Sequence, residues 1–125
     1  MEREEIFFDT YALVELVKGN PGYYKFKEVG MVTTRLNLIE LFYAILQSLG
    51  EVKAEQIYLD LKENVVDVTD EVIFDAMKFR LKNKKLGLSY VDAIGYFVAK
   101  SLNVRFLTGD EGFRHLDNVI FVKKD

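Results

Sequence analysis

Short apolar runs alternate along the chain with segments whose apolar residues recur at helical spacing. The apolar runs predict strands at residues 6–8, 31–33, 65–68, 104–107 and 119–122. The helical spacing predicts helices over 11–18, 35–49, 51–63, 70–84 and 89–102, and a short helical turn over 111–116. Residues 22–29 are ambiguous, with a short helix as one interpretation. Strands that alternate with helices are typical of an α/β domain whose parallel sheet is covered on both faces.

Two of the predicted helices carry further local signals. The segment 35–49 is apolar almost all round, so we expect that helix to be deeply covered. Thr69 has the residue type of an N-cap, and acidic residues follow it in the first turn of the next helix. The 125 residues contain no repeat, linker or low-complexity segment, which indicates a single domain over 1–125.

Composition narrows the class of protein. Half of the residues are hydrophobic, which is enough for a sizeable core, and a net charge of −3 gives the whole molecule no basic footprint. The absence of cysteine excludes disulfides, thiolate zinc sites and cysteine nucleophiles, and His115 is the one histidine. The acidic N-terminus does not resemble a signal peptide, and no charge-free run approaches the ~20 residues that span a membrane. We therefore expect a cytoplasmic protein.

Four acidic residues stand alone in apolar segments: Asp9, Glu40, Asp92 and Asp110. A carboxylate that is buried without a partner is costly, and one shared divalent cation would compensate all four. Asp9 and Asp110 both lie just past the carboxyl ends of predicted strands, which is where ligands of open α/β sheets bind. We expect the four acids to converge at one edge of the sheet.

Each acid also has a purely structural interpretation. Asp92 fits the S-x-x-[DE] capping pattern that begins at Ser89, and Asp9 could cap the first helix, as could Thr10. Asp110 is a favoured turn residue. Glu40 is the hardest to explain in this way, since only a distant Lys or Arg would neutralise it.

A shared metal site explains the four acids together better than four separate local roles do. Oxygen ligands select a hard cation, so we expect Mg²⁺ or Mn²⁺, and such an ion would activate a water for attack on a phosphate. Without metal the crowded carboxylates should hold protons more tightly, and metal binding should release those protons.

These residues, in this order and spacing, resemble the PIN-domain family of metal-dependent ribonucleases, and in particular the VapC toxins of VapBC toxin–antitoxin modules. The matching segments cover essentially the whole chain: FFDTYALVEL, TTRLNLIELFYAIL, LSYVDAIGYFVAK and FLTGDEGFRHLDNV.

The resemblance implies a three-layer α/β/α sandwich around a parallel sheet. It places the four acids at the metal-binding positions and makes Thr108 a hydroxyl residue that orients a carboxylate or a water. It further implies hydrolysis of single-stranded or looped RNA, a small antitoxin protein as partner and a homodimer. Some relatives carry another acid where this chain has Gly112, so a second metal would be held weakly or only with substrate.

Basic and aromatic residues offer further contacts. The candidates for the RNA backbone are Lys78, Arg80, Lys82, Lys84, Lys85 and Arg114. The run from Lys78 to Lys85 is also typical of an ordinary solvated face that complements a helix dipole, and this interpretation is preferred. His115 is expected to be structural or exposed. Tyr23, Tyr24 and Phe26 are expected in the core, with a dimer or antitoxin surface as the alternatives.

Other classes of protein fit less well. A phosphatase of the haloacid-dehalogenase type needs a second Asp at the position of Tyr11, and a response-regulator receiver needs an acidic pair after its first strand and a Lys-Pro after its last. Neither pattern is present. A PIN fold without catalysis, which binds RNA or protein, is the remaining alternative.

Overall fold

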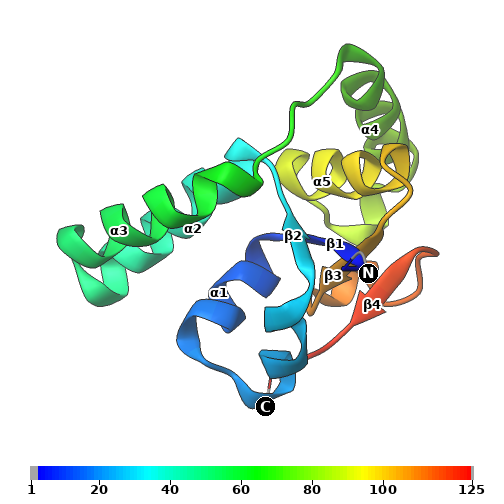
Figure 1. Ribbon diagram of the computed structural model, residues 1–125. Coiled ribbons are helices and arrows are strands. Elements are labelled where there is room, and N and C mark those ends of the chain that lie inside the picture. The colour runs from blue at the N-terminus through cyan, green and yellow to red at the C-terminus, as the bar shows by residue number, and fades with distance from the viewer. Residues whose placement is uncertain (1–2, 125) are drawn as a thin grey trace.

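Four parallel strands form the centre of the molecule in the order β2-β1-β3-β4 (Figure 1). The computed structural model describes residues 3–124. The strands are β1 (Glu5–Phe8), β2 (Gly30–Val32), β3 (Arg105–Thr108) and β4 (Val119–Phe121). The α-helices are α1 (Thr10–Lys18), α2 (Arg35–Leu49), α3 (Glu51–Leu61), α4 (Asp70–Lys82) and α5 (Tyr90–Ser101). Short 3₁₀-helices are η1 (Pro21–Glu28), η2 (Lys62–Asn64), η3 (Lys84–Leu86) and η4 (Glu111–Phe113).

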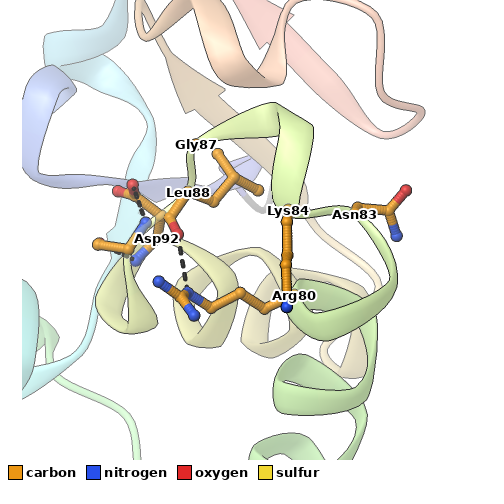
Figure 2. A pocket seen from close by; sticks show the side chains of 7 residues that line it. Arg80, Asn83, Lys84, Gly87, Leu88 and Asp92 are labelled. Carbon is orange, nitrogen blue, oxygen red and sulfur yellow. Dashed lines mark hydrogen bonds between the residues drawn. The ribbon is translucent and has the colours of Figure 1, made fainter.

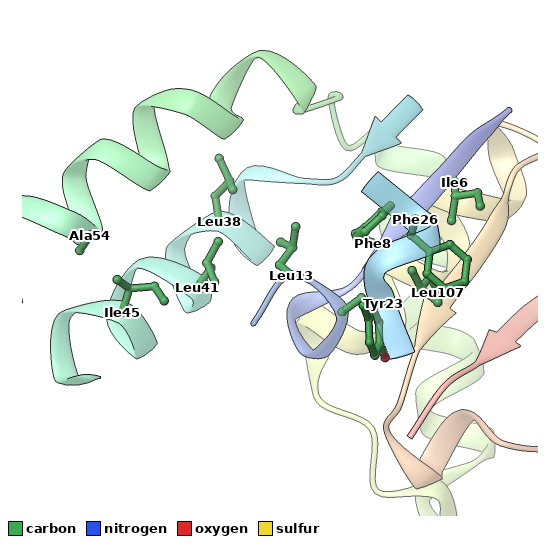
Figure 3. Close-up of a cluster of buried hydrophobic side chains, with 11 residues drawn as sticks. Ile6, Phe8, Leu13, Tyr23, Phe26, Leu38, Leu41, Ile45, Ala54 and Leu107 are labelled. Carbon is green, nitrogen blue, oxygen red and sulfur yellow. The ribbon is translucent and has the colours of Figure 1, made fainter. Parts of the chain in front are cut away.

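The alternation of side chains along β1 and β3 builds a core on each face of the sheet. On one face Ile6, Phe8 and Leu107 pack with α1, η1 and the α2–α3 pair (Figure 3). On the other face Phe7 and Phe106 stack at 5.4 Å and pack against α4 and α5. The three-layer α/β/α arrangement around a parallel sheet is therefore confirmed.

The strand order creates a switch point between β1 and β3. The chain runs from β1 to β2 on one side, and it later enters β3 on the other side of β1. Crevices at the carboxyl ends of such strands are where open α/β sheets bind ligands. The Asp9 amide donates to the Leu107 carbonyl at 3.2 Å, which joins the two strand ends.

The segment 65–68 is not a strand, which corrects the prediction from its apolar run. Only Val65 forms a bridge, to Thr33, and the Val66 amide then donates to the Thr33 carbonyl at 2.9 Å. The chain touches the edge of the sheet once and turns towards α4. Val66 and Val68 are covered by packing under α4 and α5, so their apolar character reflects burial without strand pairing.

The prediction that helix 35–49 is deeply covered is wrong, although its bounds are confirmed. Leu38, Leu41 and Ile45 are buried, whereas Ile39 and Tyr43 are 53% and 63% exposed. Figure 1 shows α2 and α3 running together away from the sheet, so only one side of α2 meets other elements. Apolar character all round a helix therefore did not mean burial all round here.

The other predicted elements lie close to their expected positions. Residues 22–29 form the 3₁₀-helix η1, and the predicted turn 111–116 is shortened to η4. The helix predicted over 70–84 ends at Lys82 and is followed by η3, and the one over 51–63 ends at Leu61 and is followed by η2. None of the helices within residues 3–124 is long and apolar enough to cross a membrane.

Candidate functional site

The four predicted acids occupy the positions that the sequence indicated. Asp9 follows β1 and Asp110 follows β3, so both lie at the switch point. Glu40 is on α2 and Asp92 is in the first turn of α5, and these helices cover opposite faces of the sheet. None of the four forms an ion pair with a basic residue in the described part of the chain.

Asp9 is the most deeply buried of the four, with 2% of its surface exposed. It is the N-cap of α1, and its Oδ1 accepts a hydrogen bond from the Ala12 amide at 2.8 Å. Burial raises the pKa of Asp9 to about 7, and the charges of Asp92 and Asp110 add to the rise. The Asp9 carboxylate therefore both caps α1 and lies near the charges of Asp92 and Asp110.

Thr108 connects the two acids at the strand ends. Its side chain is fully buried, and its Oγ1 accepts from the Asp110 amide at 3.0 Å. A hydrogen bond from the same side chain opposes the rise in the pKa of Asp9. Asp110 in turn accepts from the Gly112 amide at 2.9 Å, as expected of a turn residue.

Glu40 is held by a hydroxyl, and the distant Lys or Arg that its structural alternative would need does not appear among its partners in the described residues. The Thr10 hydroxyl donates to Glu40 Oε1 at 2.5 Å, and Thr10 Oγ1 accepts from the Asn37 amide nitrogen at 3.1 Å. Asn37 Oδ1 accepts from the Thr34 hydroxyl at 2.6 Å. Asp9 therefore caps α1, and the Thr10 hydroxyl donates to Glu40 instead.

Sequence reasoning missed Thr10, Thr34 and Asn37 as parts of the site. Asn37 and Thr34 are each 1% exposed, so this hydrogen-bonded chain is largely shielded from water. A signal was present, because Asn37 lies three residues before Glu40 and shares its side of an otherwise apolar helix. A second polar residue at that spacing indicates a shared environment.

Asp92 combines a capping role with contact to the charge cluster. Ser89 and Asp92 form a full capping box, in which Asp92 Oδ2 accepts from the Ser89 amide at 2.8 Å. Burial raises the pKa of Asp92; the hydrogen bond from Ser89 opposes the rise, and the charges of Asp110 and Glu40 add to it. The predicted cap is confirmed, and it coexists with an electrostatic link to two other acids.

The four carboxylates have the right ligand atoms for a hard cation, but they are not arranged closely enough to enclose one. All the candidate ligands are oxygens, as Mg²⁺ and Mn²⁺ prefer. Within residues 3–124, however, no three acidic or histidine side chains stand close enough together to enclose an ion. One oxygen of each acid is engaged by a nearby amide or hydroxyl. The four acids lie near enough for their charges to act on Asp9 and Asp92, and we call them the acidic cluster. To bind one ion, their side chains would have to move closer together.

Two glycines allow close approaches beside Asp110. A Cβ on Gly109 would lie 2.1 Å from the Tyr11 ring and 2.5 Å from the Val122 carbonyl oxygen. A Cβ on Gly112 would lie 2.8 Å from the Leu86 carbonyl oxygen. The place where some relatives carry a further acid is therefore filled here by the segment that enters α5.

The basic candidates divide into two groups. Arg80 and Lys84 line a hollow that also includes Asp92 (Figure 2). Arg114 binds Glu111 through two hydrogen bonds of 2.7 and 2.9 Å and lies over the Phe121 ring. The structure brings the first two beside the acids. His115 is exposed, in agreement with one of its two expected roles.

The aromatic group of η1 belongs mostly to the core. Tyr23 and Phe26 are buried, and the Tyr23 hydroxyl donates to the Val122 carbonyl at 2.6 Å. Tyr24 is 50% exposed, so the default prediction of core packing holds for two of the three residues.

The PIN domain family model matches residues 6–119 of the chain. No curated protein sequence matches it. Among solved structures, a toxin–antitoxin complex from Klebsiella pneumoniae aligns over 92% of this chain and 95% of that chain, with a TM-score of 0.74 and 18% identity. DNA-bound VapBC from Salmonella typhimurium aligns over 96% and 98%, with a TM-score of 0.74 and 14% identity. Mycobacterium tuberculosis VapC20, described as a sarcin-ricin loop cleaving toxin, aligns over 82% and 86%, with a TM-score of 0.66 and 18% identity.

The chain therefore belongs to the PIN domain family, and its fold is similar to that of VapC-type proteins. The sequence resemblance to that family is confirmed. At these identities the structural similarity concerns the fold, and the chemistry has to be argued from the residues of the site.

Proposed function

We propose that the chain is a metal-dependent endoribonuclease, the toxin of a VapBC-type toxin–antitoxin pair, which hydrolyses phosphodiester bonds in single-stranded or looped RNA. The observation that carries the proposal is the placement of Asp9 and Asp110 just beyond the carboxyl ends of the adjacent parallel strands β1 and β3, at the switch point of the sheet. Asp9 is buried there and forms no ion pair with a basic residue in the described part of the chain, and a cation would compensate such a carboxylate.

In this proposal Asp9, Glu40, Asp92 and Asp110 hold Mg²⁺ or Mn²⁺. When bound, such an ion polarises a water for attack and neutralises charge on the scissile phosphate. The raised pKa values of Asp9 and Asp92 mean that metal binding releases protons.

The surrounding residues position these acids. The Thr108 side chain hydrogen-bonds to Asp9 and accepts from the backbone amide of Asp110, and the Thr10 hydroxyl donates to Glu40. Hydrogen bonds of this kind to metal ligands support affinity and activity. The glycine at 112 leaves the side facing η3 without a further acid, which favours one firmly held ion.

The proposed partners are RNA, a small antitoxin protein and a second copy of the chain. Similarity to toxin–antitoxin complexes supports the antitoxin. Exposed apolar side chains on α2 and α3, including Ile39, Tyr43 and Val52, are typical of a surface that a protein partner covers. Light scattering tests the homodimer, which requires twice the chain mass of 14.5 kDa.

A second candidate function is a PIN-fold module that binds RNA or protein without cleaving it. The separation of the carboxylates favours it, because no three of the described acidic groups enclose an ion as they stand.

Cleavage of a mixed RNA pool in Mg²⁺ or Mn²⁺ separates the two candidates. The wild type should cleave, whereas Asp9→Asn and Asp92→Asn should not, although asparagine preserves both caps. Equal cleavage by all three proteins would contradict the metal-dependent mechanism. A folded wild type that binds the ion and cleaves no RNA would establish the binding module.

A further inference from the structure

A hollow of about 440 Å³ lies between the end of α4 and the start of α5, next to the acidic cluster. Its lining combines two basic side chains, Arg80 and Lys84, with Asn83, Ser89 and the carboxylate of Asp92 (Figure 2). Such a mixture of cations and small polar groups suits an anion more than an apolar ligand.

Arg80 is held in place by two contacts of its guanidinium group. Its Nε donates to the Leu88 carbonyl at 2.9 Å, and the guanidinium carbon lies 4.5 Å from the centre of the Tyr90 ring. Figure 2 shows the guanidinium reaching from α4 towards the entrance of α5. A guanidinium fixed in this way loses little entropy when it binds a phosphate.

Neither basic side chain of the hollow forms an ion pair with an acid among the described residues, although Asp92 lines the same hollow. The ion pairs found over 3–124 join Lys100 to Asp117 and join Arg114 and Lys123 to Glu111. Neither Arg80 nor Lys84 takes part. Both cations are therefore free to meet an anionic ligand beside Asp92.

Tyr90 adds a flat surface next to Arg80, although it does not itself line the hollow. The residue is 62% exposed even with the Arg80 guanidinium over its ring, and it lies in the same first turn of α5 as Asp92. Exposed aromatic rings beside basic side chains are how proteins hold single strands, with bases stacked on rings and phosphates on cations.

We propose that this hollow is a subsite for single-stranded RNA, in which Arg80 and Lys84 bind a backbone phosphate next to the scissile one and Tyr90 stacks a base. The proposal rests on the proposed function for its ligand, since it assumes that RNA crosses the acids. The proposal also explains a preference for single-stranded over double-stranded RNA, because a base that is paired and stacked within a duplex cannot stack on the Tyr90 ring at the start of α5.

Binding can be measured without cleavage. The protein carries Asp9→Asn and is titrated in Mg²⁺ with a labelled single-stranded RNA of random sequence at several salt concentrations. Adding Arg80→Gln and Lys84→Gln should weaken binding by about tenfold or more, and should reduce the salt slope by about 0.7 for the lost phosphate contact. The matched control is Lys78→Gln with Lys82→Gln, which removes the same charge from α4, the helix that carries Arg80, at positions that do not line the hollow.

The aromatic part has its own matched pair. Tyr90→Leu should weaken binding by about tenfold, as expected for one stacked base. Tyr24→Leu is the control, because Lys27 lies 4.5 Å from the Tyr24 ring in an arrangement like that of Arg80 and Tyr90, but on η1. An effect of equal size from both tyrosine variants would contradict the stacking role.

Three results overturn the proposal: equal losses from the hollow and control pairs, no loss from either, or a wild-type site that binds only an acidic protein segment and no RNA. Because Arg80 also anchors Leu88, its loss can lower stability; Lys84→Gln alone, at an exposed side chain, tests the same hollow on a stable protein. RNA that binds through Arg80 without being cleaved would support the subsite while contradicting the nuclease function.

Discussion

Two of the four acids come from the sheet and two come from the helices, and the two pairs are held differently. Asp9 and Asp110 follow adjacent parallel strands, so the backbone of the sheet fixes their separation. Glu40 and Asp92 arrive from helical layers on opposite faces and depend on side-chain contacts. The sheet therefore sets the place of the site, and the docking of α2 and α5 completes it.

The largest expected effect separates the central acid from a peripheral one. Asp9 is buried at the end of the central strand β1, and the charges of Asp92 and Asp110 add to the rise of its pKa, whereas Glu40 lies on α2 and is held by the Thr10 hydroxyl. Asp9→Asn should reduce RNA cleavage by about 1,000-fold, since a catalytic ion is worth several kcal/mol, and Glu40→Gln should reduce it less. Cleavage rates and calorimetric titration with Mg²⁺ measure both effects.

Glu15 supplies the control for that comparison. It is also a buried acid, 6% exposed, but it accepts from the Asn20 amide nitrogen at 3.0 Å, away from the cluster. Glu15→Gln should leave Mg²⁺ affinity unchanged. Equal losses of Mg²⁺ affinity from Glu15→Gln and Asp9→Asn would show that any buried carboxylate in this region has the same effect. That result would contradict a special role for the acid at the strand end.

The second effect is a dependence of stability on pH in the metal-free protein. The pKa of Asp9 rises from an ordinary value of 3.8 to about 7, so between these values the folded state binds more protons than the unfolded state. Stability should therefore fall as pH rises through that window, by on the order of 4 kcal/mol, and show no such loss below it. Urea unfolding in a chelator across the window measures the slope.

Asp9→Asn should flatten that slope, because asparagine does not titrate and still caps α1. Saturating Mg²⁺ should reverse the trend in the wild type, since the ion binds the ionised carboxylates. A variant with the wild-type slope would mean that another group is responsible.

The third effect concerns the tether of the helix-borne Glu40. Thr10→Val removes the donor to Glu40 and the acceptor for Asn37, and we expect cleavage to fall by about 10- to 100-fold. Stability should fall by about 1–3 kcal/mol, because the buried Asn37 amide loses a partner. Thr10→Ser keeps the hydroxyl and should retain both cleavage and stability; losses from Thr10→Ser as large as those from Thr10→Val would show that the hydroxyl is not the cause.

The smallest effect compares two helix caps. Ser89→Ala and Thr69→Ala each remove a side-chain acceptor, for Asp92 and Val72 respectively, and each should cost about 1 kcal/mol of stability in thermal or urea unfolding. Only Ser89→Ala should also lower cleavage, because only that cap orients a site acid. Equal activities would show that the capping box has no catalytic consequence.

Local sequence predicted the caps and the strand ends well because both depend on a few neighbouring residues. The capping box at Ser89 and the N-cap at Thr69 were readable as spacings of three residues. The choice between Asp9 and Thr10 as the cap of α1 was not readable, because the outcome depends on Asn37 and Glu40 from a distant helix.

Burial was harder to predict than element type. The apolar segment 65–68 looked like a strand because apolar runs signal burial, and here helices supply the burial without a ladder. Helix 35–49 looked covered for the same reason, yet Ile39 and Tyr43 are exposed where α2 leaves the sheet. In both segments, apolar composition did not reveal which other element of the fold, if any, packs against each side.

The sequence by itself determined which acids are the candidates for the site, in what order they come and which of them follow strands, since these are properties of residue type and local pattern. Tertiary structure decided that Thr10 serves Glu40, that Leu86 fills the space beside Gly112 and that Arg80 is held unpaired next to Asp92. Each of these contacts joins elements that no local pattern relates, because the packing of whole helices on the sheet brings them together.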